Sequence, residues 1–197
     1  MKRAFSTLAV SAMLAAGVAG AQQVSRVDAA RLQSKIDRIN AFRASGKTTG
    51  LRTPVTETEL NAYVRYEMRD RIPAGVQDPW ISFLQNGHLV GKASVDLGRV
   101  AQSRKSASAL DPFAYMSGVL PVEVNGILTT KNGTGSFALE SASISSVPVP
   151  AWMLQEIVSY YSKSEASPQG VAIDKPFMLP SGIREIQMAQ GQAVVVQ

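Results

Sequence analysis

The chain has 197 residues, of which 45% are hydrophobic, with one histidine and no cysteine. Its 20 basic and 15 acidic residues give a formal net charge of +5, a small and scattered excess that does not predict a nucleic-acid partner. The lack of cysteine excludes disulfides, cysteine nucleophiles and the residue that a lipoprotein needs at its cleavage site.

The first 21 residues are typical of a cleaved signal peptide. Met1-Lys2-Arg3 is a basic start, Ala4 to Val18 an apolar core, and Ala19-Gly20-Ala21 a cleavage pattern. We therefore expect a periplasmic or secreted protein cut after Ala21. No later stretch approaches the ~20 consecutive apolar residues of a transmembrane helix.

Residues 22–53 are predicted to form an accessory helix and a linker. Apolar residues recur at helical spacing from Val24 to Arg43. Ser45 to Gly50, together with Thr53-Pro54, contains the glycines and the proline typical of a linker. Residues 54–197 are then expected to form one domain.

Thr56 and Glu59 have the spacing of a capping box, which predicts a helix from Thr56 to about Ile72-Pro73. The apolar face of this helix is typical of core packing. Asn61 and Tyr63 could instead contact a ligand or a partner.

Asn86-Gly87 predicts a two-residue hairpin turn between Trp80 to Gln85 and His88 to Leu97. Such a turn pairs Leu84 with Leu89 and Trp80 with Ala93. Trp80 would then share a face with these residues, and Phe83 would lie on the opposite face with Ile81 and Val90.

Asn132-Gly133 predicts a second hairpin between Leu120 to Lys131 and Thr134 to Val147. The expected register sets Leu128 opposite Phe137 and Gly126 opposite Leu139. Ser141 and Ser143 would lie on the same, largely apolar face.

The segment between these hairpins, Gly98 to Asp111, is predicted to be a surface loop. Its Arg99, Arg104 and Lys105 form either a basic lip for acidic headgroups or a solvated charge cluster.

The last third begins with a proline-started amphipathic helix from Pro150 to Tyr161. Val171 to Leu179 is strand-like, and a final hairpin about Gln190-Gly191 sets Ile186 and Met188 against Val195 and Ala193. The final strand is expected to be buried because a bare Val194-Val195-Val196 edge would favour aggregation. The predicted fold class is α+β, with N-terminal helices and a long, highly curved antiparallel sheet packed on the C-terminal-half helix.

No catalytic motif is present, and no metal or cofactor is predicted. His88, the single histidine, follows a hairpin turn and lacks partners for a metal site. Glu123 and Glu140 are predicted to share a face of the second hairpin, where carboxylates are usually solvated. A secreted hydrolase using this pair is the least favoured alternative.

The order of elements resembles that of the tubular lipid-binding (TULIP-like) superfamily. The residues that carry the resemblance are Thr56 to Asn61 at a helix start, Ala93 to Leu97 at a hairpin end, Val149-Pro150, and Phe177 to Arg184 before the last hairpin. It implies a curved sheet around a long helix, an elongated apolar cavity, and binding of a lipid or other apolar molecule without catalysis.

We therefore expect a non-catalytic envelope protein that binds a lipid or another elongated hydrophobic ligand. A membrane surface or an envelope protein is a further candidate partner. The alternative is a structural or protein-interaction module with a filled core. The predicted ligand-binding residues are Trp80, Phe83, Phe137, Leu154, Ile157, Val158, Tyr161 and Met178.

Overall fold

The computed structural model describes residues 24–46, 50–96, 98–99, 118–161, 163, 168–180 and 182–197. The helices are α1 (Arg26–Ala44), α2 (Glu57–Tyr66) and α4 (Ala151–Tyr161), with short 3-10 turns η1 (Arg69–Arg71) and η2 (Gln85–Gly87). The strands are β1 (Arg52–Thr56), β2 (Val76–Phe83), β3 (His88–Asp96), β4 (Val119–Lys131), β5 (Thr134–Ile144), β6 (Val147–Pro148), β7 (Phe177–Met178), β8 (Glu185–Ala189) and β9 (Gln192–Val196).

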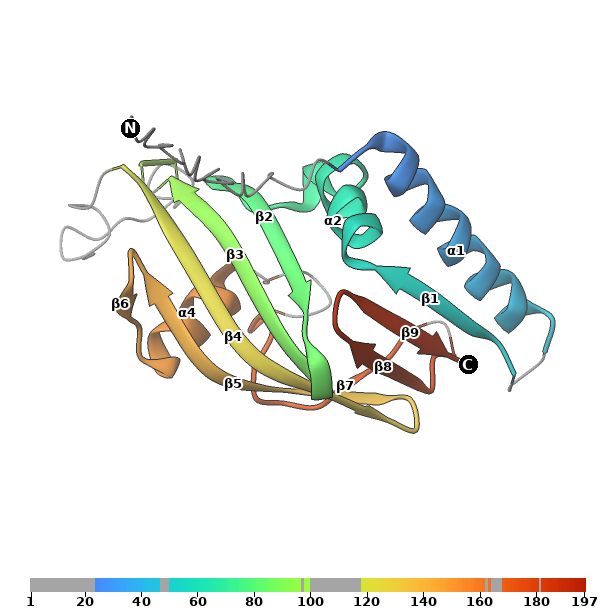
Figure 1. Cartoon of the computed structure of the whole chain (residues 1–197). Helices are drawn as coiled ribbons and strands as arrows, with labels where there is room; N and C mark the ends of the chain where they lie inside the picture. The colour runs from blue at the N-terminus through green and yellow to red at the C-terminus, as the bar shows by residue number, and fades with distance from the viewer. Residues whose placement is uncertain are drawn as a thin grey trace, which may run out of the picture.

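These strands form two antiparallel sheets, so the predicted α+β class is confirmed (Figure 1). The larger sheet has the order β2-β3-β4-β5-β6, and β7 pairs with one end of β5. The smaller sheet has the order β1-β9-β8. The final hairpin, β8–β9, therefore lies in a separate sheet from the other hairpins, and β1 is the third strand of that sheet.

The smaller sheet is built around its central strand, β9. Its register sets Ile186 opposite Val195 and Met188 opposite Ala193, as predicted. Ala193 and Val195 are buried, which confirms the expected burial of this strand. The predicted linker at Thr53-Pro54 is wrong, since these residues lie in β1. Pro54 is tolerated there because β1 is an edge strand that needs fewer backbone donors.

Helix α1 supplies part of the core beneath this sheet. Leu32 and Ile39 are buried in one cluster with Val55 of β1 and Val195 of β9. The helix has its own capping box, in which the Ser25 hydroxyl accepts from the Asp28 amide. The apolar residues whose spacing predicted this helix therefore also form the face that packs against the smaller sheet.

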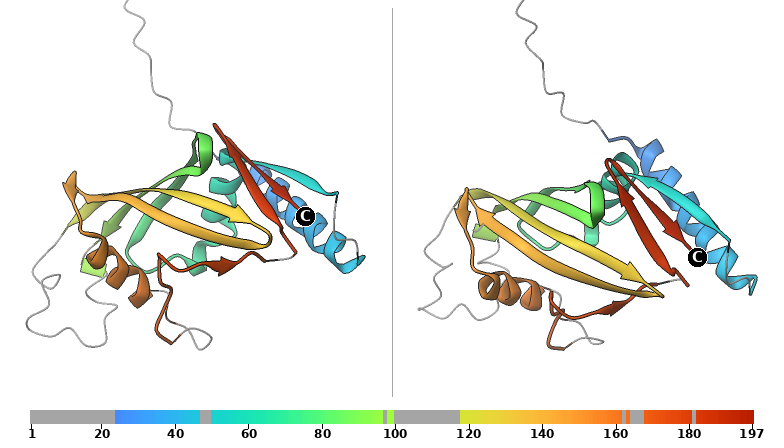
Figure 2. Two further views of the ribbon diagram at one scale, coloured as in Figure 1. Left: turned by 90° about the horizontal axis from the view of Figure 1, so that it is seen from below. Right: turned by 60° about the horizontal axis from the view of Figure 1, so that its bottom comes forward.

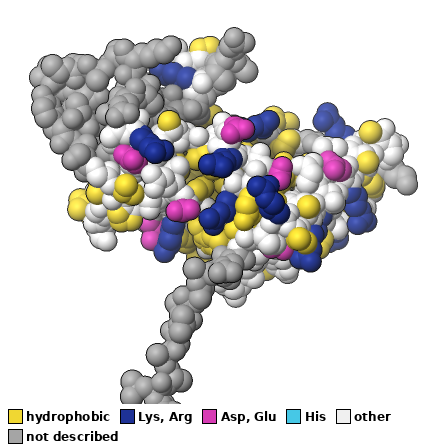
Figure 3. Space-filling model, turned by 90° about the horizontal axis from the view of Figure 1, so that it is seen from above, with side chains coloured by type: hydrophobic (Ala, Val, Ile, Leu, Met, Phe, Trp, Pro, Cys, Tyr) yellow, Lys and Arg dark blue, Asp and Glu magenta, His cyan; other side chains and the backbone are white. Residues whose placement is uncertain are grey.

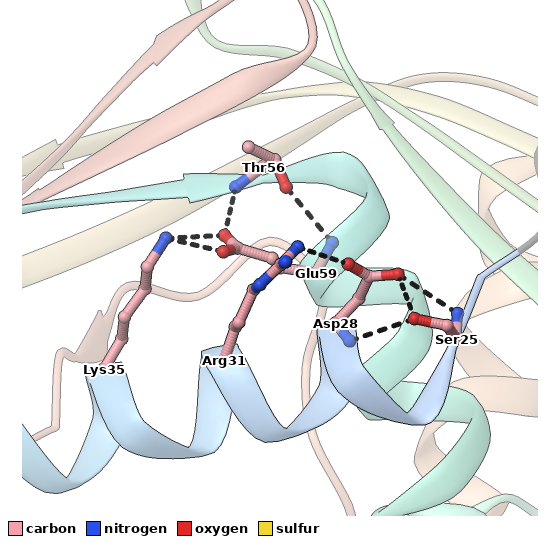
Figure 4. Close-up of polar contacts among 6 residues, drawn as sticks. All are labelled: Ser25, Asp28, Arg31, Lys35, Thr56 and Glu59. Carbon is pink, nitrogen blue, oxygen red and sulfur yellow. Dashed lines mark hydrogen bonds and ion pairs between the residues drawn. The ribbon is translucent and has the colours of Figure 1, made fainter.

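An ion pair joins α1 to the start of α2 (Figure 4). Lys35 Nζ lies 2.7 Å from both carboxylate oxygens of Glu59. The same carboxylate accepts from the Thr56 amide, and the Thr56 hydroxyl accepts from the Glu59 amide. The predicted capping box is thus confirmed and is shared with a neighbouring helix.

Helix α2 ends at Tyr66, well before the predicted Ile72-Pro73. The apolar face ends there, and the charged residues that follow form the short turn η1. Asn61 is 1% exposed. Its amide nitrogen donates to the Ile81 carbonyl, and its amide oxygen accepts from the Ile81 amide, each at 2.8 Å. Asn61 is therefore an anchor between α2 and β2.

The two Asn-Gly turns differ. At Asn132 and Gly133 the φ angles are 51° and 79°, and Lys131 pairs with Thr134, which confirms the two-residue turn. Asn86-Gly87 instead belongs to the three-residue turn η2, and Phe83 pairs with Leu89.

The predicted register of the first hairpin is therefore wrong by one residue. Trp80 pairs with Lys92 and so lies on the opposite face from Phe83 and Leu89. Leu84 moves, together with Trp80, from the predicted apolar face to the opposite face. The physical reason is the extra residue in the turn, since a shift of one residue moves every side chain of a strand to the other face.

The second hairpin keeps the predicted register up to Leu139. Leu128 pairs with Phe137, and Gly126 pairs with Leu139. A β-bulge at residue 140 then shifts the pairing. The expected positions of Ser141 and Ser143 are wrong, because an inserted residue reverses the alternation beyond it. The residues that continue the apolar face are Ala142 and Ile144.

The larger sheet consequently has one polar and one apolar face. A contact from His88 to Glu140 and an ion pair from Lys92 to Glu123 cross the polar face. The apolar face includes Phe83, Val122, Val124, Leu128, Phe137, Leu139 and Ala142. Figure 2 shows α4 beside the β5 end of this sheet.

Candidate functional site

A groove of about 580 Å³ lies between β5 and α4. Its walls come from the middle of β5, from the first turns of α4, and from the segment before β7. The lining residues are Ser136, Phe137, Ala138, Leu139, Ala151, Trp152, Gln155, Ile173 and Asp174. Asp174 is the only charged residue among them.

The groove exists because the chain leaves the edge of β5 and returns to it. At one end Ser143 and Ile144 pair with β6, and at the other Thr134 and Gly135 pair with β7. Helix α4 and residues 168–176 connect these two short strands. Between the two pairings, residues 136–142 have β4 as their only strand partner within the described part of the chain.

Helix α4 begins after Pro150, as predicted, and its first turn is closed by hydrogen bonds to the Pro150 carbonyl. Leu154 is 9% exposed and so belongs to the core, whereas Trp152 is 63% exposed. Leu154 therefore anchors the helix in the core, and the exposed Trp152 ring lies at the groove.

Gln155 fixes the opposite wall. Its amide oxygen accepts from the Ile173 amide at 2.7 Å, and its amide nitrogen donates to the Val171 carbonyl at 3.0 Å. The strand predicted for Val171 to Leu179 is wrong up to Pro176, since only Phe177–Met178 pairs with the sheet. Residues 171–173 are held by side chains of α4, among them Gln155 and Ser159, instead of by strand pairing.

A second hollow of about 300 Å³ is lined by residues of the same segment. It is lined in part by Ser159, Val171 and Phe177. The Phe177 ring covers Gly135, where a Cβ atom would lie 2.8 Å from the ring atom Cε2. This contact attaches the end of the segment to β5.

The predicted ligand-binding residues do not come together at one site. Of those whose side chains the structure describes, only Phe137 lines the groove. Trp80 packs against Val24, Ala29 and Ala62 in a cluster between the helices and β2.

Phe83 and Leu154 are buried, and Ile157 and Val158 are half-buried on α4. Met178 is 76% exposed on β7. The side chain of Tyr161 lies outside the described residues, as do Arg104 and Lys105 of the predicted basic lip.

Sequence reasoning missed most of the groove lining. The predicted register places Leu139 on the correct face, but neither Leu139 nor Trp152 is among the predicted ligand-binding residues. A tryptophan at the start of a proline-started helix is a sequence feature that could have indicated the groove. Gln155, Ile173 and Asp174 carry no such feature, because their position depends on how residues 168–176 return to the sheet.

The titratable groups of the large sheet lie on its polar face, away from this groove. Hydrogen bonds from Asn125 and Lys92, together with the charge of Lys92, lower the pKa of the Glu123 carboxyl below its ordinary value. His88 Nδ1 lies 3.1 Å from Glu140 Oε2. Both carboxylates therefore have solvent-exposed side-chain partners.

The described ranges contain no group of three His, Cys, Asp or Glu side chains placed to hold a metal ion. Seen from above, basic and acidic side chains are interspersed and do not form one basic patch (Figure 3).

None of the described helices has the length and apolar character needed to cross a membrane. Comparison with protein-family models, curated proteins and solved structures finds no match to this chain. The TULIP-like resemblance therefore stays a prediction.

Proposed function

We propose that this chain is an exported, non-catalytic protein that binds an elongated hydrophobic ligand in the groove between β5 and α4. The observation that carries the proposal is the groove itself, which places Phe137, Leu139 and Trp152 around about 580 Å³. Burial of apolar surface there would contribute roughly 25 cal/mol per Å². Export rests on the predicted signal peptide, which lies outside the described residues.

Exposed apolar side chains near the groove support the proposal. Trp152 at 63% and Val171 at 51% exposure lie on α4 and on the segment facing it. Phe177 and Met178, at 45% and 76%, follow on β7. Large apolar side chains gathered around a hollow are typical of a binding surface.

A protein-interaction module with a filled core is the second candidate. The burial of Leu154 favours it, because this side chain packs as core and does not line the groove. A hydrolase gains no support from the geometry, since Glu123 and Glu140 are each paired with a basic side chain.

A dansyl-labelled fatty acid tests the proposed function. We expect uptake by the wild-type protein and at least tenfold weaker uptake by Ala151→Trp, because an indole at this exposed position would fill the groove. Glu156→Trp is the matched control, since Glu156 is exposed on the same helix and does not line the groove. Equal uptake by both variants would remove the groove as the site.

Native mass spectrometry of the protein purified from a bacterial envelope provides a second readout. We expect an apolar molecule to co-purify with the wild type and to be lost in Ala151→Trp. If repeated preparations show neither uptake of the dansyl probe nor a co-purified molecule, the binding function is rejected and the filled-core module is favoured.

A further inference from the structure

We propose that the elongated ligand is an extended peptide, which adds as a strand to the open edge of β5. This inference rests on the proposed function and names the class of ligand. It starts from the stretch of β5 between its pairings with β6 and β7, where no other described strand covers the edge.

The backbone direction at this edge follows from two hydrogen bonds. The Leu179 amide donates to the Gly133 carbonyl, and the Val149 amide donates to the Ala142 carbonyl, each at 2.8 Å. Backbone groups alternate in direction along a strand, and the bulge at residue 140 shifts this alternation by one position between Leu139 and Ala142. The N–H and C=O groups of Phe137 and Leu139 therefore point toward the groove, in line with the Gly133 carbonyl.

These groups distinguish a peptide from a hydrocarbon chain. An acyl chain in the groove gains apolar contacts but takes the backbone of Phe137 and Leu139 away from water without replacing its hydrogen bonds, so we expect it to bind more weakly than a peptide. An extended peptide would pair with the same groups and still bury apolar side chains. Strand addition at an exposed sheet edge is a general mode of peptide recognition.

The flanking strands define the direction, length and pattern of the peptide. β6 and β7 both run antiparallel to β5, so a peptide continuing their line is also antiparallel. Residues 136–141 leave room for about five residues at ~3.4 Å each. Alternate side chains would face Phe137 and Leu139 or the polar side beyond Ser136, which favours alternating apolar and polar residues. Asp174 favours a basic residue near one end.

A random heptapeptide display library, selected on the full-length protein, tests the inference. We expect enriched sequences to alternate apolar and polar residues and to lose binding to Ala151→Trp. Synthetic copies of one enriched peptide then carry N-methyl groups on either the odd or the even backbone nitrogens. One set should bind about tenfold more weakly per methyl group, because it loses hydrogen bonds to β5, and the other should bind as the parent does.

The outcomes separate this inference from the proposed function. If the protein takes up the dansyl fatty acid but enriches no peptide, the peptide inference is rejected and the groove is kept as the proposed site for an apolar ligand. Equal effects of both methylation patterns also overturn strand addition. Sedimentation of the protein alone provides a further check, since self-association that Ala151→Trp abolishes would assign the edge to a second copy. If neither the fatty acid nor any peptide binds, both proposals are rejected.

Discussion

The Phe137 ring lies over Gly126 on the neighbouring strand. A Cβ atom at Gly126 would lie 2.8 Å from Phe137 Cε2 and 2.6 Å from the Ala138 carbonyl oxygen. The ring comes from the diagonal position, because Gly126 itself pairs with Leu139. One aromatic side chain therefore covers the gap that the glycine leaves in the apolar face, and it does so next to the groove.

Gly126→Ala should lower the free energy of unfolding by roughly 2 kcal/mol or more, because the Ala138 backbone cannot yield to the added methyl group. Urea denaturation measures the change. Gly91→Ala on β3 is the control, since its nearest neighbour would be the Val124 carbonyl oxygen at 3.9 Å. Equal destabilisation of both variants would contradict the packing argument.

Asn61→Ala should destabilise the protein by about 2–4 kcal/mol, because it leaves the buried N–H and C=O of Ile81 without their side-chain partner. Thermal unfolding monitored by circular dichroism checks this. Arg65→Ala, an exposed change on the same helix, should have little effect. A near-native melting temperature for Asn61→Ala would show that α2 docks by other contacts.

The ion pair between Lys35 and Glu59 should make stability depend on pH. Burial alone raises the pKa of Glu59, but hydrogen bonds from Lys35 and the Thr56 amide bring the pKa below its ordinary 4.5. A lowered pKa in the folded state stabilises the protein above that ordinary value, and this stabilisation is lost as the pH falls through the folded pKa.

Denaturation of the wild type and Glu59→Gln between about pH 7 and pH 3 tests this coupling. We expect the wild type to be about 2 kcal/mol more stable at neutral pH and this difference to shrink below about pH 4.5. Asp37→Asn, on the exposed side of α1, serves as the control. A difference that stays constant with pH would contradict the role of the Glu59 charge.

Gln155→Ala should loosen the attachment of Ile173 to α4. The Ile173 amide then loses its acceptor, and its hydrogen exchange should accelerate by about tenfold or more. Exchange of the Ile186 amide, which donates to the Thr130 hydroxyl, is an internal reference. Unchanged exchange at Ile173 would mean that other contacts hold the segment.

Local patterns predicted the local structure well. The helices α1 and α4, the start of α2, the capping box at Thr56 and the turn at Asn132-Gly133 all depend on neighbouring residues. The register of the last hairpin followed in the same way from Gln190-Gly191. In each of these cases the interactions that decide the structure lie within a few residues of one another.

The remaining features depend on distant contacts. The bulge at residue 140 and the extra residue in the turn at Asn86 each add one position, and this reverses the faces of whole strands. The groove was unpredictable for a related reason. It needs β6 and β7 to pair at opposite ends of β5, although Pro148 and Phe177 are separated by α4 and an irregular segment.

The position of β9 between β1 and β8 affects the order in which the molecule can fold. Arg52 binds Gln187, 135 residues further along the chain, so the smaller sheet closes only across a very long loop. Leu32 and Ile39, made early at the ribosome, must wait for Val195 before their cluster is complete. The smaller sheet and this cluster therefore cannot close until β9 has been made, which would keep this part of the molecule open for passage through a secretion pore if the protein is exported as proposed.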